Sequence, residues 1–380
     1  MKVLVNGAAL RLPLTGIGQY VRYLFSAMEE LAEDLELHLY DGFRLHQGMC
    51  LPSRNPVAHG LYPLARRILP KPRTLRQWAQ RSFFAWQTRP FKDCLYHEPG
   101  FLAFPHDGPL VVTLHDLSCF DLPETHPRER VALLRRKLPA ILARADRVIV
   151  ISKATGQALR RWFDLPETRL RVTHLAAAPC FHPRPVAELE APLATLGLCP
   201  GAYLLCVGTR EPRKNLATLF AAYGGLPESL RRRYPLVVAG MSGWGQEALP
   251  GAWAGKGDVR FTGYIRDDLL PFLYAGAAAF AYPSRYEGFG LPPLEAMASG
   301  VPVLTGNQTS LPEVVGNAGL MRDPDDIDGF REGLQRLLED TDEAARFARL
   351  GLLRAADFSW QRCARETLAV YREVLSARKE

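Results

Sequence analysis

The stretch Glu287-Gly-Phe-Gly-Leu-Pro-Pro-Leu-Glu295, continued by Ala-Met-Ala-Ser-Gly300-Val-Pro-Val303, is the part of the chain that decides the fold. Its first two glycines permit a tight turn and a close backbone approach to a ligand. The pair Pro292-Pro293 suits the first turn of a helix, where a missing N–H costs nothing. The stretch therefore predicts a glycine-rich turn, a helix and a buried strand, which is the unit from which parallel α/β sheets are built.

The turn ahead of this helix is also a predicted anion site. The first N–H groups of a helix have no partner within it, and the positive end of the helix dipole lies behind them. With Glu287 on one side and Glu295 on the other, the layout suits a sugar that is joined to a phosphate. The amides expected to be free are those of Gly288, Phe289, Gly290 and Leu291.

Short apolar runs alternate with helical stretches along the chain, a pattern typical of parallel sheets wrapped by helices. Two sets of strands imply two doubly wound lobes. Five prolines between Ala178 and Gly201 mark the linker between them. In the first half the predicted strands are 2–6, 36–40, 110–114, 147–151 and 170–174. In the second half they are 203–207, 235–239, 259–262, 278–282, 302–304 and 319–322.

The bulk properties are those of a soluble globular protein. A chain of 380 residues is too long for one ordinary core, so two domains are expected. No apolar run reaches the roughly 18 residues that a membrane-spanning helix needs, and the start of the chain is too quickly polar for a signal peptide. The seven cysteines contain no Cys-x-x-Cys pair, so a reducing cytosol is the expected compartment.

Positive charge is concentrated in residues 42–92. This block holds ten Lys and Arg residues and no Asp or Glu up to Lys92, whereas the whole chain carries +7, so the rest of the chain is net negative. Within 73–88, apolar residues fall near one helical face and the arginines lie largely off it. Five aromatic residues lie among the charges: Trp78, Phe83, Phe84, Trp86 and Phe91.

Three interpretations of this block remain open from the sequence. An amphipathic helix on an anionic membrane surface explains basic charge combined with tryptophan. A nucleic-acid partner explains the charge, but no recognised nucleic-acid motif accompanies it, so no nucleic acid is expected. The third interpretation is a solvated helix whose aromatic residues pack on the first lobe.

The motifs resemble those of one enzyme family. Besides the stretch 287–303, four segments follow the family's order: Val207-Gly-Thr-Arg-Glu-Pro-Arg-Lys-Asn-Leu216, Phe261-Thr-Gly-Tyr264, Tyr282-Pro-Ser284 and Ser310-Leu-Pro-Glu-Val-Val315. Two upstream segments match less specifically: Leu114-His-Asp-Leu117 and Val150-Ile-Ser-Lys153. Together these segments resemble the retaining glycosyltransferases of family 4, and most of all the bacterial mannosyl- and rhamnosyltransferases of O-antigen synthesis. The resemblance is close in the C-terminal half and looser in the N-terminal half.

The resemblance implies a GT-B fold, in which two Rossmann-like domains face each other across a cleft. An acceptor-binding domain would span 1–185, and a nucleotide-sugar-binding domain would span 200–359. A C-terminal helix over 360–380 would cross back and pack on the first domain. The ligand cleft would lie between the lobes, at the carboxyl ends of both sheets.

The same resemblance assigns the two glutamates of the motif to the donor. Glu287 would contact hydroxyl groups of the donor sugar, and Glu295 the hydroxyl groups of the ribose. The chemistry fits, because ionised carboxylates accept hydrogen bonds from vicinal diols. The alternatives are a loop carboxylate for Glu287 and a favourable charge in the first turn of a helix for Glu295.

A basic pair, Arg213 and Lys214, follows the strand that ends at Val207. Two adjacent cations can neutralise a diphosphate and stabilise the negative charge that grows as the sugar leaves. The family often has an arginine directly after the glycine of this segment, where this chain has Thr209. Either Arg210 or Arg213 is therefore expected to contact the diphosphate.

Three further positions are candidate site residues. The family places Gly16-Ile-Gly18, expected in the loop between the first strand and the first helix, by the donor phosphate and the acceptor, and a plain flexible turn is the alternative. His115 ends the strand 110–114 and would lie beside the donor sugar, unless it is a structural histidine. Tyr264 would border or stack on the nucleobase, with core packing as the equal alternative.

Asp323-Pro-Asp325 and Asp326-Ile-Asp328 both spell Asp-x-Asp, the metal-diphosphate motif of a different glycosyltransferase fold. Here both follow a predicted strand and precede a predicted helix, so turn formation and capping explain them. No metal is expected, and no other cofactor, since the nucleotide sugar is a substrate.

The expected reaction moves a hexosyl unit from a nucleoside-diphosphate sugar to a hydroxyl group with retention of the anomeric configuration. By the resemblance, the donor is a GDP-sugar of mannose or rhamnose, and the acceptor is a polyprenyl-diphosphate-linked glycan of lipopolysaccharide O-antigen or a similar surface polysaccharide. The enzyme would be cytoplasmic, peripheral at the inner face of the cytoplasmic membrane. Two other functions stay open: a glycoside hydrolase that uses the carboxylate pair, and a non-catalytic two-lobed sugar-binding protein. The expected catalytic residues are His115, Arg213, Lys214 and Glu287.

Overall fold

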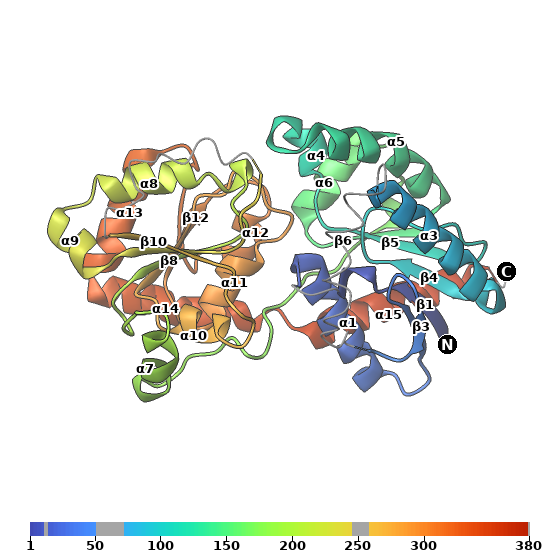
Figure 1. Ribbon diagram of the computed structural model, residues 1–380, viewed down its shortest axis with the longest axis horizontal. Coiled ribbons are helices and arrows are strands. Elements are labelled where there is room, and N and C mark those ends of the chain that lie inside the picture. Colours follow the sequence, from blue (N-terminus) through green and yellow to red (C-terminus); the bar gives the residue numbers. More distant parts are fainter. Residues whose placement is uncertain (11–13, 51–71, 245–257, 379–380) are drawn as a thin grey trace.

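Each half of the chain builds one mostly parallel β-sheet with helices on both faces, and the two halves form separate lobes (Figure 1). The computed structural model describes residues 1–10, 14–50, 72–244 and 258–378, and for 72–78 the backbone alone. The predicted α/β fold with two doubly wound lobes is confirmed. Both chain termini lie on the first lobe (Figure 1).

The first sheet has seven strands in the order β3-β2-β1-β4-β5-β6-β7. All neighbours are parallel except β2 and β3, which pair antiparallel at one edge. Most of these strands are buried, as expected for a sheet covered on both faces. The bounds are β1 Lys2–Asn6, β2 Glu36–Tyr40, β3 Leu45–Gln47, β4 Leu95–Glu98, β5 Leu110–Leu114, β6 Arg147–Val150 and β7 Leu170–Val172.

The second sheet has six strands, all parallel, in the order β10-β9-β8-β11-β12-β13. The strand order reverses between β8 and β11, and in open α/β sheets ligands bind at the carboxyl ends of the strands beside such a reversal. The bounds are β8 Leu204–Val207, β9 Leu236–Ala239, β10 Val259–Gly263, β11 Ala279–Tyr282, β12 Val303–Gly306 and β13 Leu320–Arg322.

The helices cover both sheets, and none in the described ranges combines the length and the apolar character needed to cross a lipid bilayer. Those of the first lobe are α1 Gly16–Leu31, α3 Pro72–Gln87, α4 Ser118–Asp121, α5 Arg128–Arg144, α6 Lys153–Trp162 and α15 Trp360–Ser376. Those of the second lobe are α7 Val186–Ala194, α8 Leu216–Gly224, α9 Glu228–Arg233, α10 Leu270–Ala275, α11 Leu291–Ala298, α12 Leu311–Val315, α13 Ile327–Glu339 and α14 Thr341–Ala356.

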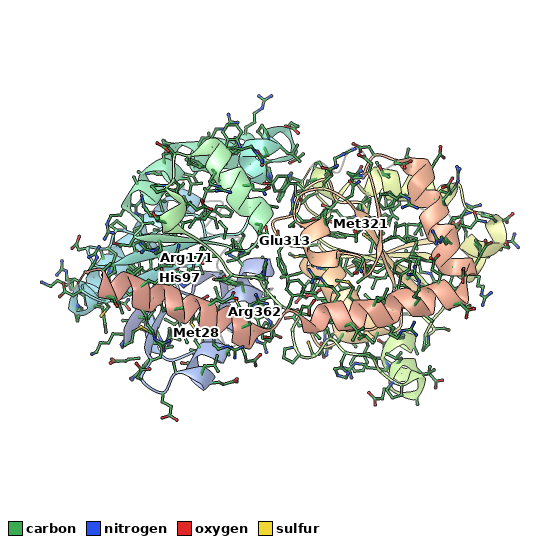
Figure 2. The ribbon with its side chains drawn as sticks, turned by 180° about the vertical axis from the view of Figure 1, so that it is seen from behind. Met28, His97, Arg171, Glu313, Met321 and Arg362 are labelled. Atoms are coloured by element: carbon green, nitrogen blue, oxygen red, sulfur yellow. The ribbon has the colours of Figure 1, made fainter. Side chains whose placement is uncertain are left out.

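The last helix, α15, returns to the first lobe and lies along it (Figure 2). The Trp360 ring at its start stacks on Tyr23 of α1, with ring centroids 5.6 Å apart. Near its end, the Tyr371 hydroxyl pairs with Nδ1 of the buried His97 in β4 at 2.5 Å. The chain therefore passes between the lobes twice, first after β7 and again between α14 and α15.

Three elements differ from the sequence-based expectations. Strands β3 and β4 were not predicted, and helix α7 lies inside the segment expected to be a proline-rich linker. Pro185 directly precedes α7 and Pro192 lies within it, so prolines did not prevent the helix. Strands β1, β2 and β5 have the predicted bounds, and the other predicted strands differ by one or two residues at their ends, where strand pairing stops.

Candidate active site

The loop between β11 and α11 carries Glu287, whose side chain is buried among polar and charged side chains. We call it and the side chains that contact it the Glu287 group. Glu287 Oε1 accepts a hydrogen bond from Lys214 Nζ at 2.7 Å, and its Oε2 accepts one from Arg213 Nη1 at 3.1 Å. The Ser284 hydroxyl also donates to Oε1, and Lys214 donates to the Tyr282 hydroxyl as well. The structure thus brings three of the four predicted catalytic side chains into direct contact.

The charges in this group fix the state of the carboxyl. Burial would raise the pKa of Glu287, but Lys214 and Arg213 outweigh burial and hold that pKa at about 2. Burial, and then the charge of Arg213, lower the pKa of Lys214. Glu287 is therefore ionised at neutral pH and cannot serve as a proton donor, and a carboxylate held by two cations is a weak base or nucleophile. Glu287 could therefore not be the proton donor of a glycoside hydrolase pair.

Arg213 and Lys214 lie in a short 3-10 turn between β8 and α8. The turn ends at Asn215 with φ +53, a left-handed conformation in which asparagine is enriched. Arg213 also donates to Glu211 Oε2 at 2.9 Å and to the Tyr286 carbonyl at 2.8 Å. Two carboxylates thus balance the two cations, and an anion bound here would need further donors.

Those donors are backbone amides in the turn that leads into α11. Within the described part of the chain, four successive N–H groups there donate no hydrogen bond. Ser310 Oγ lies 2.9 and 2.7 Å from the carbonyl oxygens of Glu287 and Phe289, so these two carbonyls share its single O–H. Gly290 has φ +114, which explains a glycine at this position. The four amides are those of Gly288, Phe289, Gly290 and Leu291.

Gly288 is the point at which this turn touches the first lobe. A Cβ on Gly288 would lie 1.7 Å from the carbonyl oxygen of His115, so no other residue fits. The His115 ring is buried, and its Nε2 lies 2.8 Å from the carbonyl oxygen of Pro99. A carbonyl can only accept, so Nε2 carries the proton and Nδ1 is the acceptor. Burial lowers the pKa of His115, which keeps the ring neutral at pH 7.

Glu295 lies on α11 and makes no contact with the Glu287 group. Partial burial raises the pKa of Glu295 to about 8, although the nearby Tyr274 hydroxyl partly favours the carboxylate. Burial, and then the charge of Glu295, raise the pKa of Cys180, which places Glu295 near the first passage between the lobes. Glu295 is therefore mostly protonated at pH 7, and the ionised form would be the stronger acceptor for the predicted ribose contact.

Gly16 and Gly18 lie inside helix α1, so the expectation of a loop at these positions was wrong. The helix begins at Gly16. A Cβ on Gly18 would lie 2.6 Å from the Ala9 carbonyl oxygen, so this glycine allows α1 to pack against the turn Ala8–Leu10. Gly16 meets nothing within 4 Å among the described residues, which leaves room at the start of the helix.

Arg210 and Tyr264 lie away from the Glu287 group, toward β10. The Arg210 guanidinium lies over the Phe261 ring, 5.4 Å from its centroid. Of the two arginines that the sequence left open, the structure brings only Arg213 to Glu287. Tyr264 is 44% exposed, so the alternative that it packs in the core is wrong.

The side chain of Phe289 is buried on the side of the turn that faces the two passages between the lobes. Its ring centroid lies 6.0 Å from that of His174, just after β7, and 5.6 Å from that of Phe358, between α14 and α15. These contacts leave the backbone N–H of Phe289, and not its ring, as the group available to a ligand.

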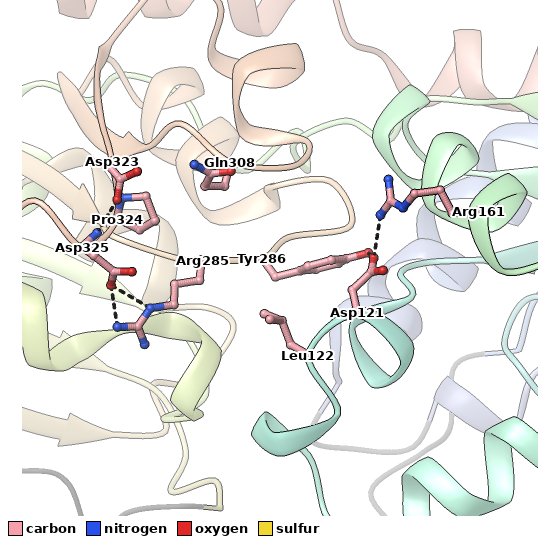
Figure 3. Close-up of a pocket in the computed structure, with 9 residues that line it drawn as sticks. All are labelled: Asp121, Leu122, Arg161, Arg285, Tyr286, Gln308, Asp323, Pro324 and Asp325. Carbon is pink, nitrogen blue, oxygen red and sulfur yellow. Dashed lines mark hydrogen bonds and ion pairs between the residues drawn. The ribbon is translucent and has the colours of Figure 1, made fainter.

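A pocket of about 370 Å³ opens beside the Glu287 loop at the seam between the lobes (Figure 3). Across the seam, the Tyr286 hydroxyl donates to Asp121 Oδ2 at 2.9 Å, and Arg161 donates to the same oxygen at 3.1 Å. On the second lobe, Arg285 donates to Asp325 at 2.8 Å. The other lining residues are Leu122, Gln308, Asp323 and Pro324.

The two Asp-x-Asp segments form a turn and a helix cap. Asp323 accepts the backbone N–H of Asp325 at 2.9 Å, and Asp326 accepts that of Gly329 at 2.8 Å, which caps α13. Among the residues that the structure describes, no group of three or more His, Cys, Asp or Glu side chains could hold a metal ion.

Sequence reasoning missed the hydroxyl groups that hold the active-site turn. Thr309, at φ +54, accepts the backbone N–H of Glu287 at 2.9 Å. Ser284 and Ser310 lie in segments that carry the family resemblance, which was the signal available, but their roles depend on the folded geometry. Thr155, which was missed, and Ser152, which lies in the matching segment Val150-Ile-Ser-Lys153, also reach the turn from the other lobe.

Two family models match the sequence. The model described as Glycosyltransferase Family 4 matches residues 14–176, which hold β2 to β7. The model described as Glycosyl transferases group 1 matches residues 200–351, which hold β8 to β13. Each lobe is therefore matched separately.

Known proteins match this chain over nearly its full length, both in structure and in sequence. Sucrose-phosphate synthase from Thermosynechococcus elongatus superposes with a TM-score of 0.76 at 21% identity, covering 99% of this chain and 100% of that one. Anabaena Alr3699/HepE in complex with UDP-glucose gives 0.71 at 17% identity, covering 99% and 100%. Both show the GT-B fold. O-antigen chain mannosyltransferase B of Escherichia coli is 38% identical, covering 98% of this chain and 100% of the relative. With a relative this similar along its whole length, the chain belongs to glycosyltransferase family 4, as the motifs predicted.

Proposed function

We propose that this glycosyltransferase moves a hexosyl unit from a nucleoside-diphosphate sugar with retention of the anomeric configuration and without a metal ion. The observation that carries the proposal is the placement of four unpaired amides beside the Lys214–Glu287–Arg213 group. The amides and Lys214 would hold the diphosphate and stabilise its charge as the sugar leaves. Glu287 has lone pairs left to accept a hydrogen bond from a sugar hydroxyl.

In this mechanism the protein supplies position and electrostatics, and no side chain forms a covalent intermediate. The acceptor hydroxyl attacks the anomeric carbon on the face that the diphosphate leaves, and the leaving phosphate takes the hydroxyl proton. Neutral His115 would accept a sugar hydroxyl at Nδ1. Closure of the lobes would exclude water, which could otherwise hydrolyse the activated sugar.

The remaining donor contacts lie toward β10 and α11. Arg213, rather than Arg210, would share the diphosphate, because it is the arginine that lies beside Glu287. Glu295 would accept the ribose hydroxyls, and the exposed ring of Tyr264 would border the nucleobase. Gly16, at the open start of α1, would let the first lobe approach the donor.

The proposed donor is GDP-mannose and the proposed acceptor is a lipid-linked glycan. The name of the Escherichia coli relative, O-antigen chain mannosyltransferase B, supports mannose over rhamnose and supports an O-antigen type of glycan as the acceptor. A growing O-antigen on a polyprenyl diphosphate would bring the reaction to the membrane surface.

A basic and aromatic surface supports membrane contact by the first lobe. Phe43, Phe83 and Trp86 are 41%, 46% and 63% exposed, and the first two rings lie 6.3 Å apart. Arg44 and Arg81 are exposed beside them. We call these five residues the 43–86 patch. Residues 51–71, and the side chains of 72–78 with Arg73, Arg76 and Trp78, lie outside the described part of the predicted block 42–92.

A transfer assay with a donor panel tests the reaction. We expect GDP-mannose to give the largest thermal shift and the only efficient transfer, against GDP-rhamnose, UDP-glucose and ADP-glucose. The anomeric configuration of the product, read by NMR, should equal that of the donor. An inverted product would overturn the retaining mechanism, and transfer from UDP-glucose alone would overturn the donor assignment.

Vesicle sedimentation tests the membrane contact. The triple variant Arg81→Gln, Phe83→Ser, Trp86→Ser should sediment less than the wild type with phosphatidylglycerol vesicles, and neither protein should sediment with phosphatidylcholine. The matched control is Leu353→Ser on α14 of the second lobe, because Leu353 is 66% exposed. Equal sedimentation of wild type and triple variant would remove the membrane contact through this patch.

A further inference from the structure

The start of helix α6 in the first lobe reaches the active-site turn of the second lobe. Ser152, the N-cap of α6, and Thr155, in its first turn, are fully buried. Ser152 Oγ lies 2.7 Å, and Thr155 Oγ1 3.1 Å, from the carbonyl oxygen of Gly288. A carbonyl oxygen has two lone pairs, so both hydroxyls can donate to it at once. Two side chains of one lobe thus hold one peptide group of the other.

A residue of the second lobe also contacts the start of α6. Glu313 on α12 lies between the lobes (Figure 2) and accepts the backbone N–H groups of Lys153 and Ala154 at 2.9 and 3.3 Å. First-turn amides have no partner inside their helix, and the helix dipole favours a carboxylate there. His174 Nε2 lies 2.6 Å from the same carboxylate. The N-terminus of α6 is therefore capped from both lobes.

The held carbonyl sets the direction of an amide. The C=O of Gly288 and the N–H of Phe289 belong to one planar peptide group and point in opposite directions. With the carbonyl held toward α6, the Phe289 N–H is directed away from the first lobe. The carbonyls of Glu287 and Phe289 are held by Ser310 of the same lobe. The directions of the Gly288 and Gly290 N–H groups can therefore be fixed by the second lobe alone, whereas the direction of the Phe289 N–H depends on contact with α6.

We propose that Ser152 and Thr155 are positioning residues that complete the diphosphate site only when the two lobes are together. This inference rests on the proposed function, because it assigns the four unpaired amides to the donor diphosphate. The two hydroxyls act through the Gly288 peptide group and contact neither substrate. Separated lobes bind the nucleotide with one amide unfixed, and only closed lobes present the full set of donors to the charge that develops during transfer.

The test compares the full-length wild type with Ser152→Ala, Thr155→Val and the double variant, using GDP-mannose as the probe. We expect kcat of the double variant to fall about 30-fold, since two hydrogen bonds to one carbonyl are lost. The Kd for GDP should change less than about threefold, because most donors belong to the second lobe. Small-angle scattering should show that GDP-mannose contracts the wild type and leaves the double variant extended.

Two further variants serve as a matched control and as an independent test. Thr367→Val removes a buried hydroxyl that donates to the Cys363 carbonyl at 2.8 Å within α15, so it should keep full kcat. Glu313→Gln leaves both hydroxyls in place and weakens the hydrogen bonds from the α6 backbone to residue 313. It should lower kcat by less than the double variant does, with little change in the Kd for GDP. It also serves as the test if the double variant does not fold.

Three results would overturn either the positioning role alone or the proposed function as well. If the wild type is active and the double variant keeps both its kcat and its contraction, the positioning role is wrong and the proposed function stands. The positioning role is also wrong if kcat falls in proportion to the loss of GDP affinity, since the hydroxyls would then support donor binding generally. A wild type that turns over no sugar nucleotide overturns the proposed function, and the positioning role with it.

Discussion

Glu287 and Glu295 belong to one motif and lie eight positions apart, yet their surroundings are opposite. Glu287 is held by Lys214 and Arg213, and its pKa is about 2. Glu295 is half-buried with no cation beside it among the described residues, and its pKa is about 8. The difference shows that burial alone does not set the state of a carboxyl, because the sign of the pKa shift depends on whether positive charges are buried with it.

The two glutamates also differ in what makes each ready to bind a ligand. The Glu287 group is assembled by the protein itself, so its geometry is set by the β8 and β11 loops. Glu295 becomes an effective acceptor only after it loses a proton, so a ribose contact there is linked to pH. Three substitutions can break or sharpen this difference, and the one with the largest expected effect comes first.

Replacing Lys214 by Met should have the largest effect. The change leaves a buried carboxylate with one cation in place of two, which is expected to lower the free energy of unfolding by about 3–5 kcal/mol. The kcat for transfer should fall about 1000-fold, since a donor to the developing charge is lost. Urea unfolding and the transfer assay measure the two effects. Full stability in this variant would mean that Lys214 does not hold Glu287 in solution, and Arg210→Ala provides a control cation outside the group.

Glu287→Gln should remove a pH dependence of stability. The pKa of Glu287 is about 2 in the folded chain against 4.5 unperturbed, so its ionic contacts stabilise the fold above pH 4.5 and are lost as pH falls toward 2. The difference in unfolding free energy between wild type and variant should therefore shrink by about 3 kcal/mol from pH 5 to pH 2. Urea unfolding at a series of pH values measures it. Parallel curves for the two proteins would contradict the assigned pKa.

Glu295→Gln should remove a smaller effect, a rise of GDP affinity with pH. The pKa of Glu295 is about 8, so the group is mostly protonated at pH 7, and the proposed ribose diol would bind its ionised form more tightly. GDP should therefore bind the wild type about tenfold more tightly at pH 9 than at pH 7. Calorimetric titration of the variant should show nearly equal affinity at both values. If the wild type also shows no change, Glu295 does not contact the ribose.

The alternation of apolar strands and helices predicted the two lobes, because strands buried on both faces read as continuous apolar runs. Strand β4 escaped prediction because half of it is polar, yet all of it is buried. His97 pairs with the hydroxyls of Tyr371 and Thr113, and Glu98 accepts hydrogen bonds from Asn6 and Tyr96. Polar residues with distant partners are invisible to a pattern of local hydrophobicity.

The motifs predicted which residues of the site meet, but not how their charges balance. Lys214 and Glu287 were both proposed as site residues, and the structure pairs them directly. That pairing, and the part of Glu211, depends on how two loops face each other. The contact of Ser152 with Gly288 joins residues 136 positions apart in different lobes, so no local pattern could reveal it.

The two passages of the chain between the lobes lie next to each other, and the His174 ring in the first lies 5.8 Å from the Phe358 ring in the second. Both passages also reach Tyr23 of α1. Cys180, in the first passage, lies within hydrogen-bonding reach of its hydroxyl, and Trp360, just after the second, stacks on its ring. Because the two connections are adjacent, we expect rotation about the line that joins them to be the easiest relative motion of the lobes. Phe289 packs on Phe358 in the second passage, so such a rotation should also shift the peptide groups of the active-site turn.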